Sequence, residues 1–396
     1  MKEDGWIKSE VSLLNKTEKP VLIMIKNDNN LDELFLEYSE KFLKCANLSV
    51  NNLRSYSNDN SKVDSWIFPI IYLYRQSLEL LVKGFLLKEL SVAECKVIFK
   101  KSKHDIAAYL EILFENIDKE KCNDLWLISF VKDITEIDKE SDVFRYPLNR
   151  KMKAYFKDTT RISYDAIYEN FNQSVSRIKY LFNEEGIHLN PSIYDPKLFN
   201  SSHEFSAYIG WRGNQAEHSP YVNSYKKLAE EMLNELDNEK KKELFLPICY
   251  LLRNSLELSL KRIFIEQSDN EYDFIEKKIQ RNGHSLLKMW NLLAREIDER
   301  NNSSVIVDGE YLPSSTIDSV REYIEVIHNW DVNSDKFRYP CDMNLNKYFI
   351  NEEVIDLMNI SNIFIELLGF LSGVDAMLEH QNEMMAEMLS GIYSYD

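Results

Sequence analysis

Apolar residues recur at helical spacing along most of the chain. Between residues 68 and 88 they surround the helix almost completely, as is typical of a buried helix at the centre of a bundle. Polar residues in this segment are confined to a narrow stripe at i, i+4 spacing. The pattern predicts an all-α fold, and further helices are expected at 31–48, 103–113, 163–184, 221–236 and 352–378.

The same pattern occurs twice along the chain. The segment PIIYLYRQSLELLVK at 69–83 returns as PICYLLRNSLELSLK at 247–261, with ten of fifteen positions identical, and SDVFRYP at 141–147 returns as SDKFRYP at 334–340. We interpret this repeat as an internal duplication, which predicts two tandem, pseudo-symmetric helical bundles. The first copy, with an N-terminal extension, is expected at 1–186, a linker at 187–220 and the second copy at 221–396.

Two short runs with strand-like composition precede the copies. They read PVLIMIK at 20–26 and FSAYIGW at 205–211. They are expected to be either paired small strands or loops packed on a core.

Composition and charge narrow the class of protein. The net charge of −17 over 396 residues argues against a broad nucleic-acid platform, so no DNA-binding surface is expected, although a local basic cleft for RNA stays open. The five Cys residues show no disulfide or zinc spacing, which favours free thiols in the cytoplasm.

The chain lacks the usual signals for membranes, metals and cofactors. No segment predicts a membrane span, because Glu366 and Asp375 interrupt the longest apolar stretch. The N-terminal residues are charged and predict no secretion signal. No phosphate-binding loop, dinucleotide fingerprint or zinc motif occurs, so neither a metal nor a cofactor is expected.

The polar stripe of the central helix keeps its residue types in both copies. An exposed stripe would require only charge, whereas here each identity recurs. Two interpretations stay open: a buried network of ion pairs, or a cleft that binds a ligand or performs catalysis, with the lysines as ligand-binding residues. The stripe consists of an Arg, a Glu and a Lys in each copy: Arg75, Glu79 and Lys83, and Arg253, Glu257 and Lys261.

A histidine precedes the next helix in each copy. Asp105 and Ser285, which follow His104 and His284, suit the N-cap of that helix. The histidine is either a capping or packing residue, or a general acid or base with a pKa near neutrality.

The SDxFRYP repeat places an arginine three residues after an aspartate. Arg145 follows Asp142 and Arg338 follows Asp335, and the proline ends any helix there. Two interpretations stay open: the segment is a structural anchor, or its arginine pairs with a stripe glutamate, Glu79 or Glu257, or with a bound anion.

The stripe followed by a histidine resembles the HEPN superfamily, especially its bacterial branches linked to toxin and phage-defence loci. The resemblance covers most of each copy. It implies helical bundles of four or five helices that dimerise, and in many members metal-independent ribonuclease activity. A duplicated chain would then be an intramolecular pseudo-dimer with a cleft between its lobes. The residues that carry the resemblance are Arg75, Ser77, Glu79, Lys83 and His104, and Arg253, Ser255, Glu257, Lys261 and His284.

The chain departs from the active family pattern, in which an arginine precedes a histidine with four to six residues between them. That spacing occurs at Arg212 and His218 and at Arg321 and His328, and neither pair recurs in the other copy. These residues are secondary candidates for the site.

Two hypotheses about function follow. The first is a HEPN-like effector of a bacterial toxin or anti-phage defence system that acts as a metal-independent endoribonuclease. The second is a non-catalytic sensor or scaffold that binds an anionic ligand or a partner protein, and homo-oligomers are compatible with both. The catalytic candidates under the first hypothesis are His104, His284, Arg75, Arg253, Arg145, Arg338, Glu79 and Glu257.

Overall fold

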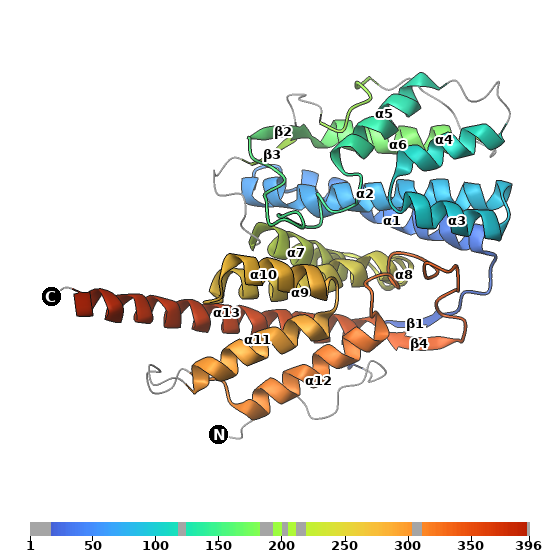
Figure 1. Ribbon diagram of the computed structural model, residues 1–396. Helices are drawn as coiled ribbons and strands as arrows, with labels where there is room; N and C mark the ends of the chain where they lie inside the picture. The colour runs from blue at the N-terminus through green and yellow to red at the C-terminus, as the bar shows by residue number, and fades with distance from the viewer. Residues whose placement is uncertain are drawn as a thin grey trace. The chain divides into compact units, whose positions relative to one another are not determined.

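The computed structural model describes residues 17–117, 124–182, 193–199, 205–210, 219–302 and 311–393. Within these ranges the chain forms thirteen helices and four short strands (Figure 1). The prediction of an all-α fold is confirmed.

Contacts within the chain define two compact units, each discontinuous in sequence. The N-terminal unit comprises Met24–Leu251 and Asp335–Glu353, and the C-terminal unit comprises Met1–Ile23, Leu252–Ser334 and Val354–Asp396. These boundaries differ from those of the sequence repeat, because a segment of the second copy belongs with the helices of the first. The division at 186 and 220 stays a prediction about the repeat.

The N-terminal unit is built around α2 (Asn60–Glu89). This helix is buried almost continuously from Trp66 to Leu86, as its apolar pattern predicts. The helix α1 (Leu31–Arg54) runs beside it, and Gly84 permits the close approach: a Cβ there would lie 2.8 Å from Leu36 Cδ2.

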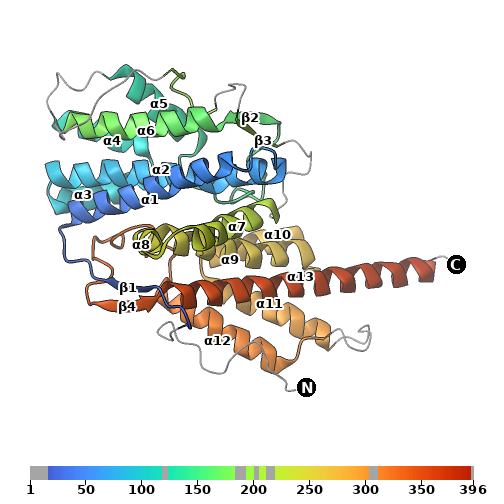
Figure 2. The same ribbon diagram turned by 180° about the vertical axis from the view of Figure 1, so that it is seen from behind.

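Other helices of this unit pack on both sides of α2. In both views α4 (Ile106–Asn116) and α6 (Tyr164–Leu181) lie on one side of α2 and α7 (Ser219–Glu235) lies on the opposite side (Figures 1 and 2). The unit also contains α3 (Val92–Ser102), α5 (Leu125–Ile137) and α8 (Asn238–Glu243).

The C-terminal unit contains the larger part of α9 (Phe245–Gln267), which begins in the other unit. Its other helices are α10 (Tyr272–Asn282), α11 (Leu286–Asn301), α12 (Ser314–Trp330) and α13 (Leu357–Tyr393). Among the described residues one stretch, 357–388 of α13, is long and apolar enough to cross a membrane by length and composition, and half of its most apolar window is buried in the fold.

Side-chain caps begin the helices that follow the two histidines. The Asp105 carboxylate accepts a hydrogen bond from the Ala108 amide at the start of α4, and the Ser285 hydroxyl accepts one from the Lys288 amide at the start of α11. These contacts confirm the predicted N-caps. Each histidine is therefore positioned by the N-cap residue that follows it.

Short strands form at both runs that the sequence singled out. The strand β1 (Leu22–Ile25) pairs with β4 (Glu353–Asp356), and β3 (Ser206–Ile209) pairs antiparallel with β2 (Thr160–Ser163). The helix expected from residue 352 begins only at Leu357, because β4 occupies the residues before it.

Candidate functional site

The carboxylate of Glu79 is the centre of a buried cluster in the N-terminal unit. It accepts hydrogen bonds from Arg75 Nη1 at 2.9 Å, from Lys83 Nζ at 2.6 Å and from the Tyr339 hydroxyl at 2.8 Å. The Nδ1 atom of His104 lies 3.2 Å from the same carboxylate. Because α2 places Arg75, Glu79 and Lys83 one turn apart, this part of the cluster is set by helix geometry alone.

Arg75 also holds the backbone of two loops. Its Nη2 atom donates to the carbonyl of His104 at 2.8 Å, and its Nε atom donates to the carbonyl of Asp138 at 3.2 Å and lies 3.2 Å from the Asp138 carboxylate. The side chain is only 1% exposed. Arg75 therefore fixes the turn before α4 and is placed to support the site rather than to contact a substrate.

Asp138 is a site residue that the sequence analysis missed. It lies four residues before Asp142, and Asp331 lies four residues before Asp335 in the second copy. This recurrence was a signal in the sequence. The recurrence alone does not connect Asp138 with the stripe. Only the contact between Asp138 and Arg75 in the structure makes that connection.

Burial and the neighbouring charges determine the protonation states of Glu79 and His104. Burial alone would raise the pKa of Glu79, but Lys83, His104 and Arg75 outweigh it and hold that pKa well below its usual range. Burial lowers the pKa of His104 in spite of the opposing effect of Glu79. At neutral pH an ionised Glu79 therefore accepts a hydrogen bond from the Nδ1–H of a neutral His104, which leaves Nε2 as the basic nitrogen.

The C-terminal unit contains the same arrangement. Glu257 accepts from Arg253 Nη1 at 3.1 Å and from Lys261 Nζ at 2.7 Å, and His284 Nδ1 lies 3.0 Å from it. Arg253 Nη2 donates to the carbonyl of His284 at 2.7 Å. The glutamate is buried in both sites, whereas the histidine side chain is 28% exposed for His104 and 38% for His284.

Tyr339 joins the second copy of the repeat to the first-copy site. Its hydroxyl, besides donating to Glu79, lies 3.2 Å from His104 Nδ1. Gln76 on α2 donates to the carbonyl of Arg338 at 3.0 Å and so fixes the segment that carries this tyrosine. Nothing local in the sequence indicates which helix Tyr339 reaches, so it is not among the predicted site residues.

The arginines of the two SDxFRYP segments contact residues of their own segments, and Arg145 Nη2 donates to the Tyr146 hydroxyl at 2.8 Å. Arg145 Nη1 lies 3.9 Å from the Asp142 carboxylate, and Arg338 Nη2 donates to Asp335 at 2.9 Å. Neither guanidinium is among the partners of Glu79, so the alternative in which one of them pairs with this glutamate does not hold.

Both guanidiniums are buried beside aromatic rings of the N-terminal unit. The guanidinium carbon of Arg145 lies 5.7 Å from the centre of the Tyr72 ring, and that of Arg338 lies 6.0 Å from the Tyr250 ring. The two rings stack at 4.6 Å. This aromatic packing compensates part of the cost of burying two cations.

The two Arg–His spacings have different outcomes. Arg212 and His218 lie outside the described residues. Arg321 and His328 lie on α12, about 10 Å apart along the helix axis, and Arg321 forms an ion pair of 2.7 Å with an aspartate one turn earlier. Burial and the guanidinium of Arg253 lower the pKa of His328.

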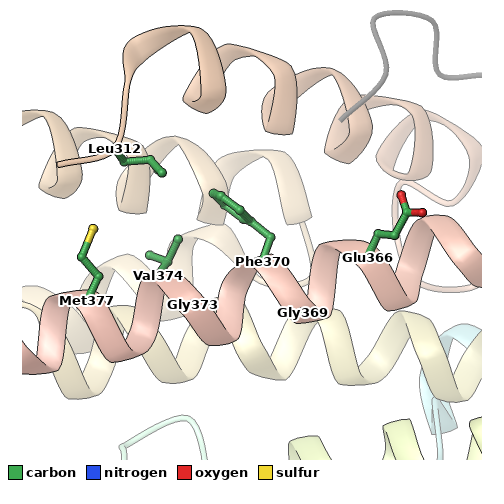
Figure 3. Close-up of a pocket in the computed structure, with 7 residues that line it drawn as sticks. All are labelled: Leu312, Glu366, Gly369, Phe370, Gly373, Val374 and Met377. Atoms are coloured by element: carbon green, nitrogen blue, oxygen red, sulfur yellow. The ribbon is translucent and has the colours of Figure 1, made fainter. Parts of the chain in front are cut away.

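Other possible ligand sites lie apart from these clusters. A pocket of about 480 Å³ runs along α13 in the C-terminal unit, where Phe370, Val374 and Met377 point toward Leu312 (Figure 3). None of the predicted site residues lines it. Across the described ranges no group of three or more His, Cys, Asp or Glu residues could hold a metal ion.

No protein-family model, curated protein or solved structure matches this chain. The function is therefore inferred from the geometry of the two Glu–His sites.

Proposed function

We propose that the protein is a HEPN-like effector of a bacterial toxin or anti-phage defence system that cleaves RNA without a metal ion. The observation that carries this proposal is a buried, ionised glutamate that orients a partly exposed histidine, present in both copies as Glu79–His104 and Glu257–His284. A carboxylate that binds Nδ1–H leaves the opposite ring nitrogen free of its proton, which is the arrangement of a general base.

The proposed reaction uses the Nε2 atom of His104 or His284. It removes the proton from a ribose 2′-hydroxyl, and the 2′-oxygen then attacks the adjacent phosphorus. The bond from phosphorus to the 5′-oxygen breaks, and that oxygen takes a proton from the imidazolium. The products are a 2′,3′-cyclic phosphate and a 5′-hydroxyl, and the imidazole ends in its starting state.

The buried cations support this reaction indirectly. Arg75 and Lys83 donate their hydrogen bonds to protein acceptors and are almost fully buried. Their part is to keep Glu79 ionised and the His104 turn fixed. Stabilisation of the pentavalent phosphorane requires cations that are exposed beside the histidine.

The test is an RNA-cleavage assay on the whole protein, with tRNA and total cellular RNA in the presence of EDTA. The double variant His104→Asn/His284→Asn keeps a donor to each glutamate at the place of Nδ1 but removes the base. We expect loss of cleavage by at least about a hundredfold with little change in melting temperature. His380→Ala, an exposed histidine on α13, is the matched control and should cleave like the wild type.

Wild-type protein that cleaves none of these RNAs would contradict the proposal, as would a double variant that cleaves normally. The two single variants separate the sites, because a single working site predicts loss in only one of them.

The second candidate function is a non-catalytic sensor or scaffold. It is favoured by the completeness of the buried network, in which Arg75, Glu79 and Lys83 all have protein partners. Under this hypothesis wild-type protein cleaves no RNA, and an anionic ligand raises the melting temperature in proportion to RT ln(1 + [L]/Kd).

A further inference from the structure

Lys103, the residue before His104, has a backbone conformation that favours glycine. Its φ is +52°, and the equivalent residue of the second copy, Gly283, has a φ of +55°. With a ψ of −94° the residue lies outside the left-handed helical region, and a residue other than glycine in such a sparsely populated conformation costs on the order of 1 to 3 kcal/mol. The first copy thus carries a lysine where the backbone alone would select glycine.

The backbone turns this way because of the buried cluster. The carbonyl of Lys103 accepts a hydrogen bond from Lys83 Nζ at 3.2 Å and another from the Tyr109 hydroxyl. Glycine would present the same carbonyl without strain. The side chain of Lys103 is exposed and the structure records no partner for its ammonium among the described residues, so the lysine adds nothing to these contacts.

The surface beside His104 is locally basic on a strongly acidic chain. Lys100 and Lys101 are exposed at the end of α3, where Lys100 Nζ donates to the Asn344 side-chain oxygen at 2.9 Å. The nearby Asp105 carboxylate is occupied by capping α4 and by an ion pair of 3.0 Å with Lys139. Residues 92–103 contain four lysines and one glutamate, whereas 272–283 contain three basic and two acidic residues.

We propose that Lys103, together with the exposed lysines of α3, forms a phosphate-binding surface that brings the anionic substrate to His104. The second copy has glycine at the same turn, so the first-copy site is the one that engages this substrate. This inference rests on the proposed function, since it supplies the exposed cations that cleavage requires. Lys103 is assigned contact with phosphate, and the strain at its φ is the cost of placing an ammonium beside the base.

The test uses the full chain and a short, fluorescein-labelled, single-stranded oligoribonucleotide as the probe. Anisotropy gives the Kd over a series of salt concentrations, and cleavage is measured on the same RNA. In Lys103→Gly we expect binding at least about fivefold weaker and a slope of log Kd against log salt smaller by about 0.7, the value for one phosphate contact on a single strand. Its melting temperature should be equal to or above that of the wild type, because strain is relieved.

Two variants serve as controls. Lys132→Ala removes an exposed lysine on α5 and should leave both Kd and slope unchanged. Gly283→Lys introduces the strained residue into the second copy, where a Cβ meets no atom within 4 Å, and should lower the melting temperature without a clash.

The outcomes separate this inference from the proposed function. A Lys103→Gly variant that binds and cleaves the RNA like the wild type overturns the phosphate surface and leaves the histidine chemistry intact. Wild-type protein that binds RNA through Lys103 but does not cleave it supports the surface and contradicts the ribonuclease. Wild-type protein that does not bind the probe overturns the surface directly.

Discussion

Replacement of Glu79 by glutamine should be among the most destabilising conservative changes in the N-terminal unit. The carboxylate is fully buried and is the shared partner of two buried cations, Arg75 and Lys83. Glutamine keeps the volume and one acceptor oxygen but removes the negative charge. Both cations then lose their closest compensation, and the amide NH₂ faces donors rather than acceptors.

The magnitude follows from the number of contacts. Breaking a buried ion pair by removing one partner costs roughly 3 to 5 kcal/mol, and here two pairs share the removed charge. Asp138 still compensates Arg75, which keeps the loss near that range. For a unit of this size each kcal/mol corresponds to about 2 to 4 °C, so Glu79→Gln should melt about 10 °C below the wild type.

The assay is thermal and chemical unfolding followed by circular dichroism at several pH values. Because the pKa of Glu79 is lowered in the folded state, its contribution is fully present above the unfolded pKa near 4.5 and is lost as the pH falls through the folded value. The difference between variant and wild type should therefore be largest at neutral pH and should narrow below about pH 4.5. Glu111→Gln, an exposed glutamate on α4, is the control and should change the stability by less than about 0.5 kcal/mol.

A Glu79→Gln variant within 1 kcal/mol of the wild type at pH 7, or a difference independent of pH, would refute this reasoning. It would mean that the two cations are compensated elsewhere. Glu257→Gln provides a second trial of the same argument, since Glu257 has the same types of partner in the C-terminal unit.

Three further changes have defined outcomes. Gly84→Ala should destabilise the fold by about 1 to 3 kcal/mol, because its Cβ would lie 2.8 Å from a side chain of α1. Gly369→Ala should stabilise it by about 0.5 to 1 kcal/mol, because its Cβ would meet no atom within 4 Å and alanine favours the helix. Chemical denaturation measures both changes. Tyr339→Phe removes a hydrogen bond to Glu79 and should raise the pKa of His104, because the carboxylate then acts more strongly on the imidazole; an unchanged NMR titration of His104 would contradict this.

The part of the site that the sequence predicted is the part determined by local geometry. Arg75, Glu79 and Lys83 recur at i, i+4, i+8, and a helix brings such residues together without help from the rest of the chain. The N-caps before α4 and α11 likewise depend on neighbours a few residues away. The sequence also indicated the histidines, since each stands directly before a capped helix start.

Tertiary structure alone decided the contacts between distant segments. Tyr339 reaches Glu79 across a separation of 260 residues, and Asp138 reaches Arg75 from a loop beyond α5. No periodicity records which loop packs on which helix, because that choice depends on the shapes and burial of both surfaces together. For the same reason the sequence suggested the strands β1 and β3 but not their partners, and it named Arg145 without its burial beside Tyr72.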